Sequence, residues 1–465
     1  MKEAEIGVMQ DTIAAIATGL TDSGIGIIRI SGEKAIETAN KIFKPKNPSK
    51  SLTKMDSFHA CFGHITYEGT TYDEAIALVM RAPHTYTTED VVELDCHGGI
   101  TVLKSIFELL VSLGVRPADP GEFTKRAFLG GRLDLSQAES VMDLIHAKNK
   151  DAASASLRQL SGAFSNTLSS MRDQLLHETA YIESALDDPE NYSLEDYPQS
   201  LSNVVDNLLT TVDRLLSTGS DGRLLKEGIR TIIIGRPNVG KSSVLNMLMG
   251  EERAIVTEVA GTTRDTLEEW INIGGISLNL VDTAGIRATD DIVERIGVEK
   301  ALSTINEANL VLYIVDGSEP LSEHDLTLME RLKGKKVITL INKNDRKIVV
   351  DKLLISEKID TEIIEISALM GTGSEELAAA IRRMFFSGSI NTNDQIYITN
   401  ARHLSLLTET KNALSRVKDS IDAGMGEDFF TIDLMDAYTA LGKILGKEVE
   451  DDLVNKIFSE FCMGK

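Results

Sequence analysis

The residues with the clearest chemical potential form an eight-residue segment, GRPNVGKS, which begins at Gly235 and ends at Ser242. It matches the pattern G-x-x-x-x-G-K-[ST], whose glycines let backbone N–H groups approach phosphate oxygens closely. In this pattern Lys241 neutralises charge on the β- and γ-phosphates, and the Ser242 hydroxyl can bind Mg²⁺. The segment therefore predicts a nucleoside triphosphate site.

Three later motifs indicate that the nucleotide is GTP. DTAG begins at Asp282, which suits direct or second-sphere Mg²⁺ binding, and the Gly285 N–H can meet the γ-phosphate. NKND ends at Asp345, whose carboxylate can accept from both the N1–H and the 2-amino group of guanine. Because adenine has no 2-amino group, GTP is expected over ATP. With SAL at Ser367, the predicted GTP-binding residues are Asn238, Val239, Gly240, Lys241, Ser242, Ser243, Thr257, Thr262, Thr263, Asp282, Thr283, Ala284, Gly285, Asn342, Lys343, Asp345, Ser367 and Ala368.

The hydrolytic residues depart from the common GTPase pattern. The segment AGTTRD lies where a switch loop would supply Thr263 to Mg²⁺. Ile286 follows DTAG, where many GTPases place the Gln that orients the attacking water. Asn238 could instead hold a cation beside the leaving-group oxygens, and Glu294 could orient the water through an intermediary. For each residue a non-catalytic alternative is equally open: Asn238 could be a solvated loop residue, and Glu294 could be a carboxylate on a helix surface.

The elements around these motifs predict a multidomain α/β protein. Residues 1–125 mix short β-branched runs with Gly and Pro, which favours an α+β domain. Strand and helix patterns alternate over residues 229–385, which indicates a mostly parallel sheet with helices on both faces. Residues 126–228 and 386–465 are helical in pattern. We expect these two segments to pack as one discontinuous helical domain on either side of an inserted Ras-like G domain.

Two local signals refine the helical segments. Ser136 and Glu139 fit an S-x-x-E capping box at the start of a helix. The Gly-rich STGSDGR at residues 217–223 is expected to stop a later helix.

The charge balance limits the classes of partner. The 465 residues carry 48 basic and 71 acidic side chains, a formal charge of −23, which argues against a surface that generally coats nucleic acid or an anionic membrane. Its three cysteines are scattered, with no zinc or disulfide pattern. No apolar run reaches the roughly 18 residues that span a bilayer. A soluble, cytoplasmic protein is expected.

The motifs, together with longer segments, resemble the MnmE (TrmE) family of tRNA-modification GTPases, a Ras-type family of the TrmE-Era-EngA-like group. The resemblance extends over essentially the full chain. It is carried by GIGIIRISG, YTTEDVVELDCHGG, RPADPGEFTKRAFLGGRLDLSQAE, GRPNVGKSS, IVTEVAGTTRD, DTAGIR, VERIG and the terminal FCMGK.

The resemblance implies a homodimer whose domain at residues 1–125 dimerises and binds 5-formyl- or methylene-tetrahydrofolate. It also implies a FAD-containing partner, MnmG (GidA), in a heterotetramer or larger assembly. Together they would install a carboxymethylaminomethyl-type group at C5 of the tRNA wobble uridine (position 34), using a folate one-carbon unit. Hydrolysis of GTP would depend on K⁺ and on contact between two G domains.

The resemblance also assigns roles to single residues. Ser242 and Thr263 would bind Mg²⁺, and Glu294 would orient the water. Cys462 is a candidate in the modification chemistry, although a small apolar residue packing a terminal helix is an equal alternative. The predicted catalytic residues are therefore Glu294, Lys241, Asp282 and Cys462; the K⁺ ligands are Asn238, Thr257, Val259 and Thr262; and the folate-binding residues are Arg29, Glu93, Arg132 and Lys465.

Two other functions share some of these features. A ribosome-assembly or RNA-binding GTPase has the same GTTRD switch but carries a basic KH-like domain after the G domain. A signalling switch would have no modification chemistry. If tRNA is the substrate, the acidic chain is expected to bind it weakly and with steep salt dependence, either through its partner or through a small basic surface around Lys125, Arg126 and Arg132.

Overall fold

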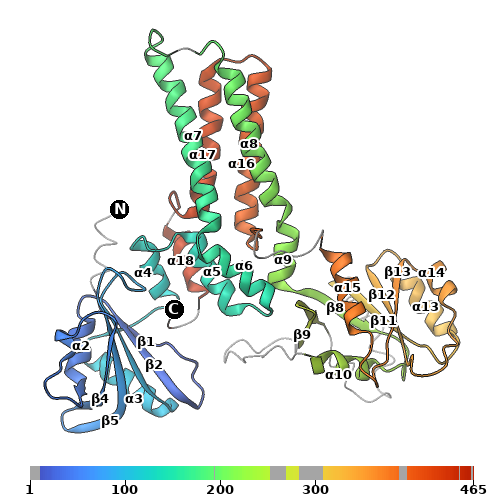
Figure 1. Ribbon diagram of the computed structural model, residues 1–465, viewed down its shortest axis with the longest axis horizontal. Helices are drawn as coiled ribbons and strands as arrows, with labels where there is room; N and C mark the ends of the chain where they lie inside the picture. Colours follow the sequence, from blue (N-terminus) through green and yellow to red (C-terminus); the bar gives the residue numbers. More distant parts are fainter. Residues whose placement is uncertain are drawn as a thin grey trace. The chain divides into compact units, whose positions relative to one another are not determined.

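The computed structural model describes residues 11–192, 194–251, 269–281, 307–386, 395–449, 451–461 and 464 (Figure 1). The chain divides into two compact units. Unit 1 comprises Met1–Met142, Ser165–Arg172 and Thr439–Lys465, and unit 2 comprises Asp143–Phe164 and Asp173–Tyr438. The three-domain boundaries expected from the sequence stay a prediction.

Unit 1 is built on a seven-stranded sheet in the order β3-β4-β5-β6-β2-β1-β7. Neighbouring strands are antiparallel, except for the parallel pair of β1 and β7. Ala75, Ala77 and Val79 of β5 are buried and Ile76 between them is exposed, as expected for a sheet with one covered face. The strands are β1 (Ile13–Ile16), β2 (Ser23–Ser31), β3 (Phe43–Pro45), β4 (His59–Tyr67), β5 (Thr70–Met80), β6 (Val91–Gly98) and β7 (Arg116–Pro117).

Two helices, α2 (Ala35–Ile42) and α3 (Ile100–Ser112), cover the buried face of this sheet (Figure 1). Their apolar side chains share one core with the inward-facing residues of the strands, including Ile28, Leu94 and Ile106. The other face carries the polar residues discussed below. Unit 1 also contains η1 (Leu52–Lys54), α4 (Glu122–Leu129), α18 (Asp451–Ser459) and most of α5 (Leu135–His146).

The start of α5 differs from the prediction. Asp134 Oδ1 accepts from the Gln137 backbone N–H at 2.9 Å, and Gln137 Oε1 accepts from the Asp134 N–H at 3.0 Å. Ser136 lies inside the helix and donates to Asp134. The capping box is therefore Asp134 with Gln137, and the predicted box of Ser136 and Glu139 is wrong, because the helix begins two residues earlier.

Unit 2 contains a six-stranded sheet in the order β13-β12-β11-β8-β10-β9, parallel except for β9 against β10. Strands β11 and β12 are buried along their whole length, as a sheet covered on both faces requires. The predicted mostly parallel sheet is confirmed. Its strands are β8 (Ile229–Ile234), β9 (Glu269–Ile273), β10 (Ile276–Leu280), β11 (Leu310–Asp316), β12 (Val337–Asn342) and β13 (Thr361–Glu365).

Helices cover both faces of this sheet. One apolar core joins Ile233 to Leu245 of α10 (Lys241–Glu251) and Leu377 of α15 (Ser374–Phe385). A second core joins Ile232 to Met329 of α13 (Glu323–Leu332) and Ile355 of α14 (Lys352–Lys358). The carboxyl ends of β8, β11 and β12 therefore lie side by side at one edge, where ligands bind in such sheets.

The remaining helices of unit 2 include α8 (Tyr197–Ser217) and α16 (Ala401–Asp422), which come from distant parts of the chain and lie side by side (Figure 1). Lys411 Nζ pairs with Asp213 Oδ1 at 2.7 Å across this contact. The other helices of this group are α6 (Lys150–Leu160), α7 (Ala163–Asp187), α9 (Gly219–Glu227) and α17 (Glu427–Leu445). None of the helices described here is long and apolar enough to cross a membrane.

The segment STGSDGR ends helix α8 as predicted, because α8 stops at Ser217. A separate helix, α9, begins at Gly219 after a single residue. Gly222 lies inside α9 and allows close packing, because a Cβ there would lie 2.4 Å from the Ile398 carbonyl oxygen.

Candidate functional site

The loop between β8 and α10 has the backbone geometry that its glycines predict. Gly235 has φ of 157° and Gly240 has φ of 98°, both in the region that disfavours side chains. A Cβ at Gly235 would lie 2.4 Å from the Ile314 carbonyl oxygen, and one at Gly240 would lie 2.3 Å from Asn342 Nδ2. Glycine is therefore required for the loop to pack this closely on β11 and β12.

The lysine of this loop bends back over it. Lys241 Nζ donates to the carbonyl oxygens of Gly235 at 3.0 Å and Arg236 at 2.7 Å. Ser242 and Ser243 follow at the exposed N-terminal end of α10, where the helix dipole favours anions. The ammonium group, the hydroxyls and the helix end thus converge as a triphosphate requires.

Asn342 joins three parts of the nucleotide site. Its side chain is buried, with Nδ2 donating to the Val239 carbonyl at 2.9 Å and Oδ1 accepting from the Ala368 N–H at 3.1 Å. It therefore ties the NKND segment to the P-loop on one side and to the SAL segment on the other.

Asp345 is placed to recognise a purine edge. Its side chain is exposed, and its Oδ1 accepts from Ser367 Oγ at 2.6 Å, while Ser367 Oγ accepts from the Met370 N–H at 3.2 Å. Ser367 is fully buried, so this hydrogen bond fixes the carboxylate while leaving it open to solvent. The arrangement fits a carboxylate that accepts from two donors of guanine.

Replacing Asp345 with asparagine is expected to change the base preference. The amide keeps the shape of the carboxylate but presents donors where guanine also has donors, so GTP affinity should fall by about 1–3 kcal/mol, or roughly 5- to 150-fold. Xanthosine triphosphate, which has a carbonyl in place of the 2-amino group, should gain relative affinity. Titrations with both nucleotides measure this change, and Asp360→Asn is the control, because Asp360 is an exposed carboxylate at the opposite, amino end of β13. Equal losses for both nucleotides would contradict the assignment.

Lys343 links the base-recognition segment to β11. Its backbone has φ of 67°, and its Nζ lies 2.5 Å from Asp316 Oδ2 and 3.2 Å from the Asn238 carbonyl oxygen. Burial raises the pKa of Asp316, but hydrogen bonds from Lys343 and Ser318 outweigh it and the pKa is lowered overall. Asp316 therefore stays ionised near neutral pH, and the stability that its pairing contributes is lost as the pH falls through its folded-state pKa.

Eleven predicted residues lie outside the described residues. They belong to the expected switch segments, to the DTAG motif and to the chain terminus: Thr257, Val259, Thr262, Thr263, Asp282, Thr283, Ala284, Gly285, Glu294, Cys462 and Lys465. Within the described ranges, no group of three or more His, Cys, Asp or Glu side chains could hold a metal ion.

A second polar site lies on the open face of the sheet in unit 1. Arg29 of β2 and Glu93 of β6 are directly opposite each other and pair at 2.8 Å. The Arg29 guanidinium also lies 5.6 Å from the ring centre of Tyr86, and Arg132 lies 4.7 Å from the same ring. The structure therefore brings together three of the four predicted folate-binding residues around one aromatic ring.

The chain terminus reaches the same site. Arg29 Nη1 donates to the Gly464 carbonyl oxygen at 3.3 Å, next to the predicted residue Lys465. Phe123 closes another side, with its ring centre 5.6 Å from the Arg29 guanidinium. A carboxylate, two guanidinium groups and two aromatic rings form a site suited to a flat heterocycle that carries an anionic tail. We name these residues, Arg29, Tyr86, Glu93, Phe123 and Arg132, the aromatic–cationic site.

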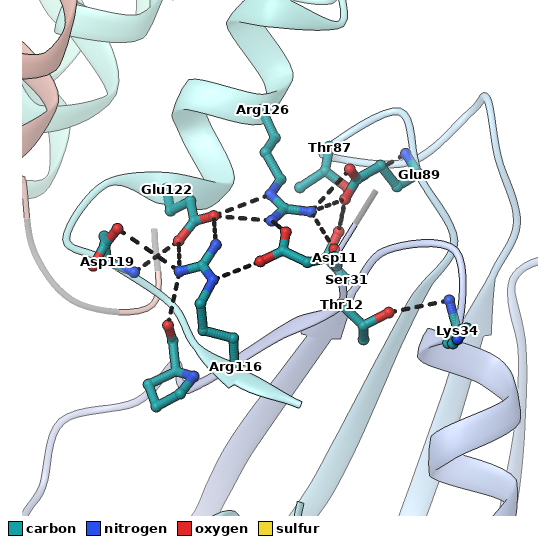
Figure 2. Close-up of polar contacts among 11 residues, drawn as sticks. Asp11, Thr12, Ser31, Lys34, Thr87, Glu89, Arg116, Asp119, Glu122 and Arg126 are labelled. Atoms are coloured by element: carbon teal, nitrogen blue, oxygen red, sulfur yellow. Dashed lines mark hydrogen bonds and ion pairs between the residues drawn. The ribbon is translucent and has the colours of Figure 1, made fainter. Parts of the chain in front are cut away.

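A buried ionic network supports the loop that carries Tyr86 (Figure 2). Arg126 of α4, whose side chain is 3% exposed, pairs with Asp11 at 2.6 Å, Glu122 at 2.9 Å and Glu89 at 3.0 Å. Arg116 pairs with Asp11 and Glu122, both at 2.5 Å. The network ties α4 to β7, to the start of β1 and to the segment just before β6.

The network corrects one expectation from the sequence. Arg126 cannot contribute to a basic surface, because it is buried and its charge is matched by carboxylates. Lys125 Nζ donates to Asn455 Oδ1 at 2.6 Å, and Arg132 lies over the Tyr86 ring. Arg126 therefore does not belong to the expected basic surface, whereas Lys125 and Arg132 have no carboxylate partner among the described residues.

Several functional positions were missed in the sequence. Tyr86 begins the quoted segment YTTEDVVELDCHGG, in which Glu93 was named, so an aromatic residue in this segment was an available signal. Asp316 and Phe123 had no such signal, because their roles come from contacts with Lys343 and Arg29 across the fold.

Comparisons with known proteins extend these observations over the whole chain. A family model described as the MnmE helical domain matches residues 135–462, and one described as the N-terminus of the GTP-binding protein TrmE matches residues 12–132. A tRNA modification GTPase MnmE of Lachnoclostridium phytofermentans is 51% identical over 455 residues, which cover 98% of this chain and 99% of that protein. Proteins of the same name from Lactobacillus delbrueckii subsp. bulgaricus and Enterococcus faecalis are each 45% identical, with 98% of both chains covered.

Among solved structures, the G domain of the T. maritima FeoB iron transporter is 27% identical. The similar region covers 33% of this chain and 97% of that chain, with a TM-score of 0.26. The full-length similarities reach the sheet of unit 1 and the helical segments as well as the nucleotide motifs.

Proposed function

Because the chain belongs to the MnmE family of tRNA modification GTPases, we propose that it couples GTP hydrolysis to modification of the tRNA wobble uridine. It is a GTPase, and the reaction yields GDP and phosphate. The observation that carries the nucleotide choice is the joint placement of Asp345, Ser367 and Asn342 beside the P-loop. In the described residues after the G domain, 395–449 and 451–461, only helices are present, which disfavours a KH-like RNA-binding domain.

Different residues of the nucleotide site bind the phosphates and the base. The P-loop N–H groups and the end of α10 hold the phosphates, and Lys241 turns from its own loop carbonyls toward the β- and γ-phosphate oxygens. Asp345 orients the base, and Lys343 supports the loop through Asp316. Negative charge that develops on the phosphate oxygens meets donors that are already in place, which lowers the barrier to hydrolysis.

Mg²⁺ and K⁺ are part of the proposal. Ser242 offers an exposed hydroxyl at the start of α10, and Asn238 offers a neutral side-chain amide oxygen in the P-loop, whose backbone carbonyl accepts from Lys343 Nζ. Both donors suit hard cations. When bound, these ions would neutralise phosphate charge, with Thr263 as the second protein ligand of Mg²⁺ and Thr257, Val259 and Thr262 completing the K⁺ set.

Replacing K⁺ with Na⁺ at constant ionic strength tests the monovalent cation. We expect the GTPase rate to fall at least tenfold, because a cation of the wrong size would no longer sit against the leaving-group oxygens. The Asn238→Ala variant should be slow in both salts and should lose the difference between them. A wild-type rate that is the same in K⁺ and Na⁺ would show that no such site exists.

The aromatic–cationic site fits a tetrahydrofolate. Glu93 can accept from the guanidine-like edge of a pterin, and the rings of Tyr86 and Phe123 can contact its plane. Arg132, exposed at the rim, can pair with a glutamyl tail, together with Lys465. The bound folate would supply a one-carbon unit, while the chain's own residues orient it.

The proposed assembly is a cytoplasmic homodimer that works with a FAD-containing MnmG-type partner on tRNA. Reconstitution tests this division of labour directly. Purified chain, FAD-containing partner, tRNA, GTP, a reduced folate as one-carbon donor and glycine as the source of the carboxymethylamino group should yield carboxymethylaminomethyl-type uridine at position 34, and omission of the chain or of GTP should abolish it. Product formed by the partner alone would refute the proposal.

A further inference from the structure

A lysine-rich segment borders the sheet of unit 1. Residues 38–55 contain five lysines and no aspartate or glutamate, in a chain with a formal charge of −23. Lys41 pairs with Glu37 at 3.0 Å. The other four are exposed, and no ion pair joins them to any other residue that the structure describes: Lys44, Lys46, Lys50 and Lys54. Such a concentration of unmatched positive charge attracts anions.

The segment is held in a defined shape. Leu52 is fully buried, and its N–H donates to Asn40 Oδ1 at 3.0 Å. Arg81, at the end of β5, donates to the Met55 carbonyl at 2.9 Å rather than to a carboxylate. Its positive charge therefore adds to that of the lysines, and the charges stand on an ordered edge of the sheet.

Two adjoining hollows open between this segment and β4. One has a volume of about 240 Å³ and the other about 440 Å³, and both are lined by Lys50 and Ala60. Lys54 and the carboxylate of Asp56 line the smaller hollow, and Lys46 and Phe62, with no carboxylate, line the larger one. We call the two hollows together the lysine groove.

The groove also contains an aromatic surface. Phe62 is 43% exposed, and Lys46 Nζ lies 5.5 Å from its ring centre. An exposed ring within a row of cations is the combination that binds single-stranded nucleic acid, because the bases stack on the ring and the cations follow the phosphates. Duplex RNA and anionic peptides have no unpaired bases that would stack on an exposed aromatic ring, so Phe62 favours a single-stranded ligand.

The lysine groove and the aromatic–cationic site share one face of the sheet. Ala60 is directly opposite Leu78, Leu78 is opposite Glu93, and Glu93 is opposite Arg29. Side chains in such register point to the same face. With strands about 4.8 Å apart, Ala60 and Arg29 are separated by roughly 14 Å across the sheet.

We propose that the lysine groove binds a single-stranded segment of tRNA, with Lys46 and Lys50 on its phosphates and Phe62 stacked on an unpaired base. The proposal deepens the proposed function and rests on tRNA being the substrate. The wobble uridine lies in an unpaired loop, which is the part of tRNA whose bases are free to stack. A loop held in the groove would lie on the same sheet face as the aromatic–cationic site.

Binding of a fluorescent anticodon stem-loop RNA to the full chain, over a series of KCl concentrations, tests the lysines. The Lys46→Ala/Lys50→Ala variant should bind more weakly, and its slope of log K against log salt should be shallower by about 1.4, since each phosphate contact to single-stranded RNA contributes about 0.7. The matched control is Lys104→Ala/Lys456→Ala, two exposed lysines of the same unit, which should retain the wild-type slope. Equal slopes for wild type and the groove variant would overturn the proposal.

The Phe62→Ala variant tests the aromatic contact separately. It should weaken binding by about 5- to 140-fold without changing the salt slope, because stacking releases no counterions. Unchanged affinity, or equally tight binding of a loop-free RNA duplex, would overturn the single-stranded assignment. GTP hydrolysis by all variants should match wild type, since none of these residues touches the nucleotide site. If the groove variants behave as expected but wobble uridine is unaltered in cells that lack the chain, the proposed function fails while the groove stands.

Discussion

Replacing Lys241 with alanine is expected to lower kcat/KM for GTP by about 10²- to 10³-fold, the usual loss when one preorganised charge or donor is removed from a transition state. The ammonium group lies on the carbonyls of Gly235 and Arg236, so it needs only a short movement to reach the phosphates. Part of the loss should appear as weaker GTP binding, because Lys241 neutralises charge in the ground state too. Steady-state hydrolysis with nucleotide titration measures both parts.

Lys347→Ala is the matched control for this experiment. Lys347 is exposed in the same unit, and its side chain makes no hydrogen bond, ion pair or ring contact with another described residue. Its removal should leave kcat/KM within twofold of wild type. Hydrolysis by Lys241→Ala at the wild-type rate would place the phosphates elsewhere than at the P-loop.

The second large effect is expected in unit 1, from Arg126→Met. Arg126 is buried among the carboxylates of Asp11, Glu89 and Glu122. Among the described residues, Arg116 would remain paired with Asp11 and Glu122, and Glu89 would keep no cationic partner. Breaking a buried ion pair by removing one partner costs about 3–5 kcal/mol. Hydrogen exchange of the β1, β2 and β6 peptides should speed up accordingly, while peptides from unit 2 serve as the internal control.

Neutralising the carboxylates that lose their Arg126 partner should restore the protection of this variant from hydrogen exchange. Adding Glu89→Gln and Glu122→Gln to Arg126→Met removes the uncompensated charge, so a large part of the lost protection should return. If the triple variant exchanges as fast as the single one, the loss comes from packing of the Arg126 side chain and not from its charge.

The same network predicts a dependence on pH. Burial raises the pKa of Glu122, but hydrogen bonds from Arg116, the Asp119 N–H and Arg126 outweigh it, so the pKa is lowered overall. A lowered folded-state pKa gives stability that is present above the unfolded-state pKa and is lost as the pH falls through the folded value. In Arg126→Met this loss should begin at a higher pH than in wild type.

The nucleotide site was largely predictable because its residues follow strand ends in a fixed order. Because β8 and β12 belong to one parallel sheet, in which only β11 lies between them, GRPNVGKS and NKND follow strand ends at the same edge of the sheet. The two hydrogen bonds that join the Asn342 side chain to Val239 and Ala368 could not be predicted, because they depend on side-chain geometry that the spacing of motifs in the sequence does not encode.

The unit 1 sites were predictable only in part. Arg29, Glu93 and Arg132 were named through a family resemblance, but nothing in their spacing shows that Tyr86 would lie between two guanidinium groups. The prediction that Arg126 belongs to a basic surface was wrong for a physical reason. In the sequence, a cation in the segment FTKR is typical of a surface residue, but in the fold carboxylates from distant segments surround it. Long-range pairing of this kind decides whether a charged residue is a ligand for phosphate or part of the core.

The most direct test is mass spectrometry of wobble uridine from cells that lack this chain and carry wild type, Lys241→Ala or Lys347→Ala in its place. We predict the carboxymethylaminomethyl-type nucleoside at position 34 with wild type and Lys347→Ala, and an unmodified or partly modified uridine with Lys241→Ala and in cells with no copy. Full modification in cells with no copy would contradict a role in this reaction. Full modification with Lys241→Ala would show that GTP hydrolysis is not coupled to it.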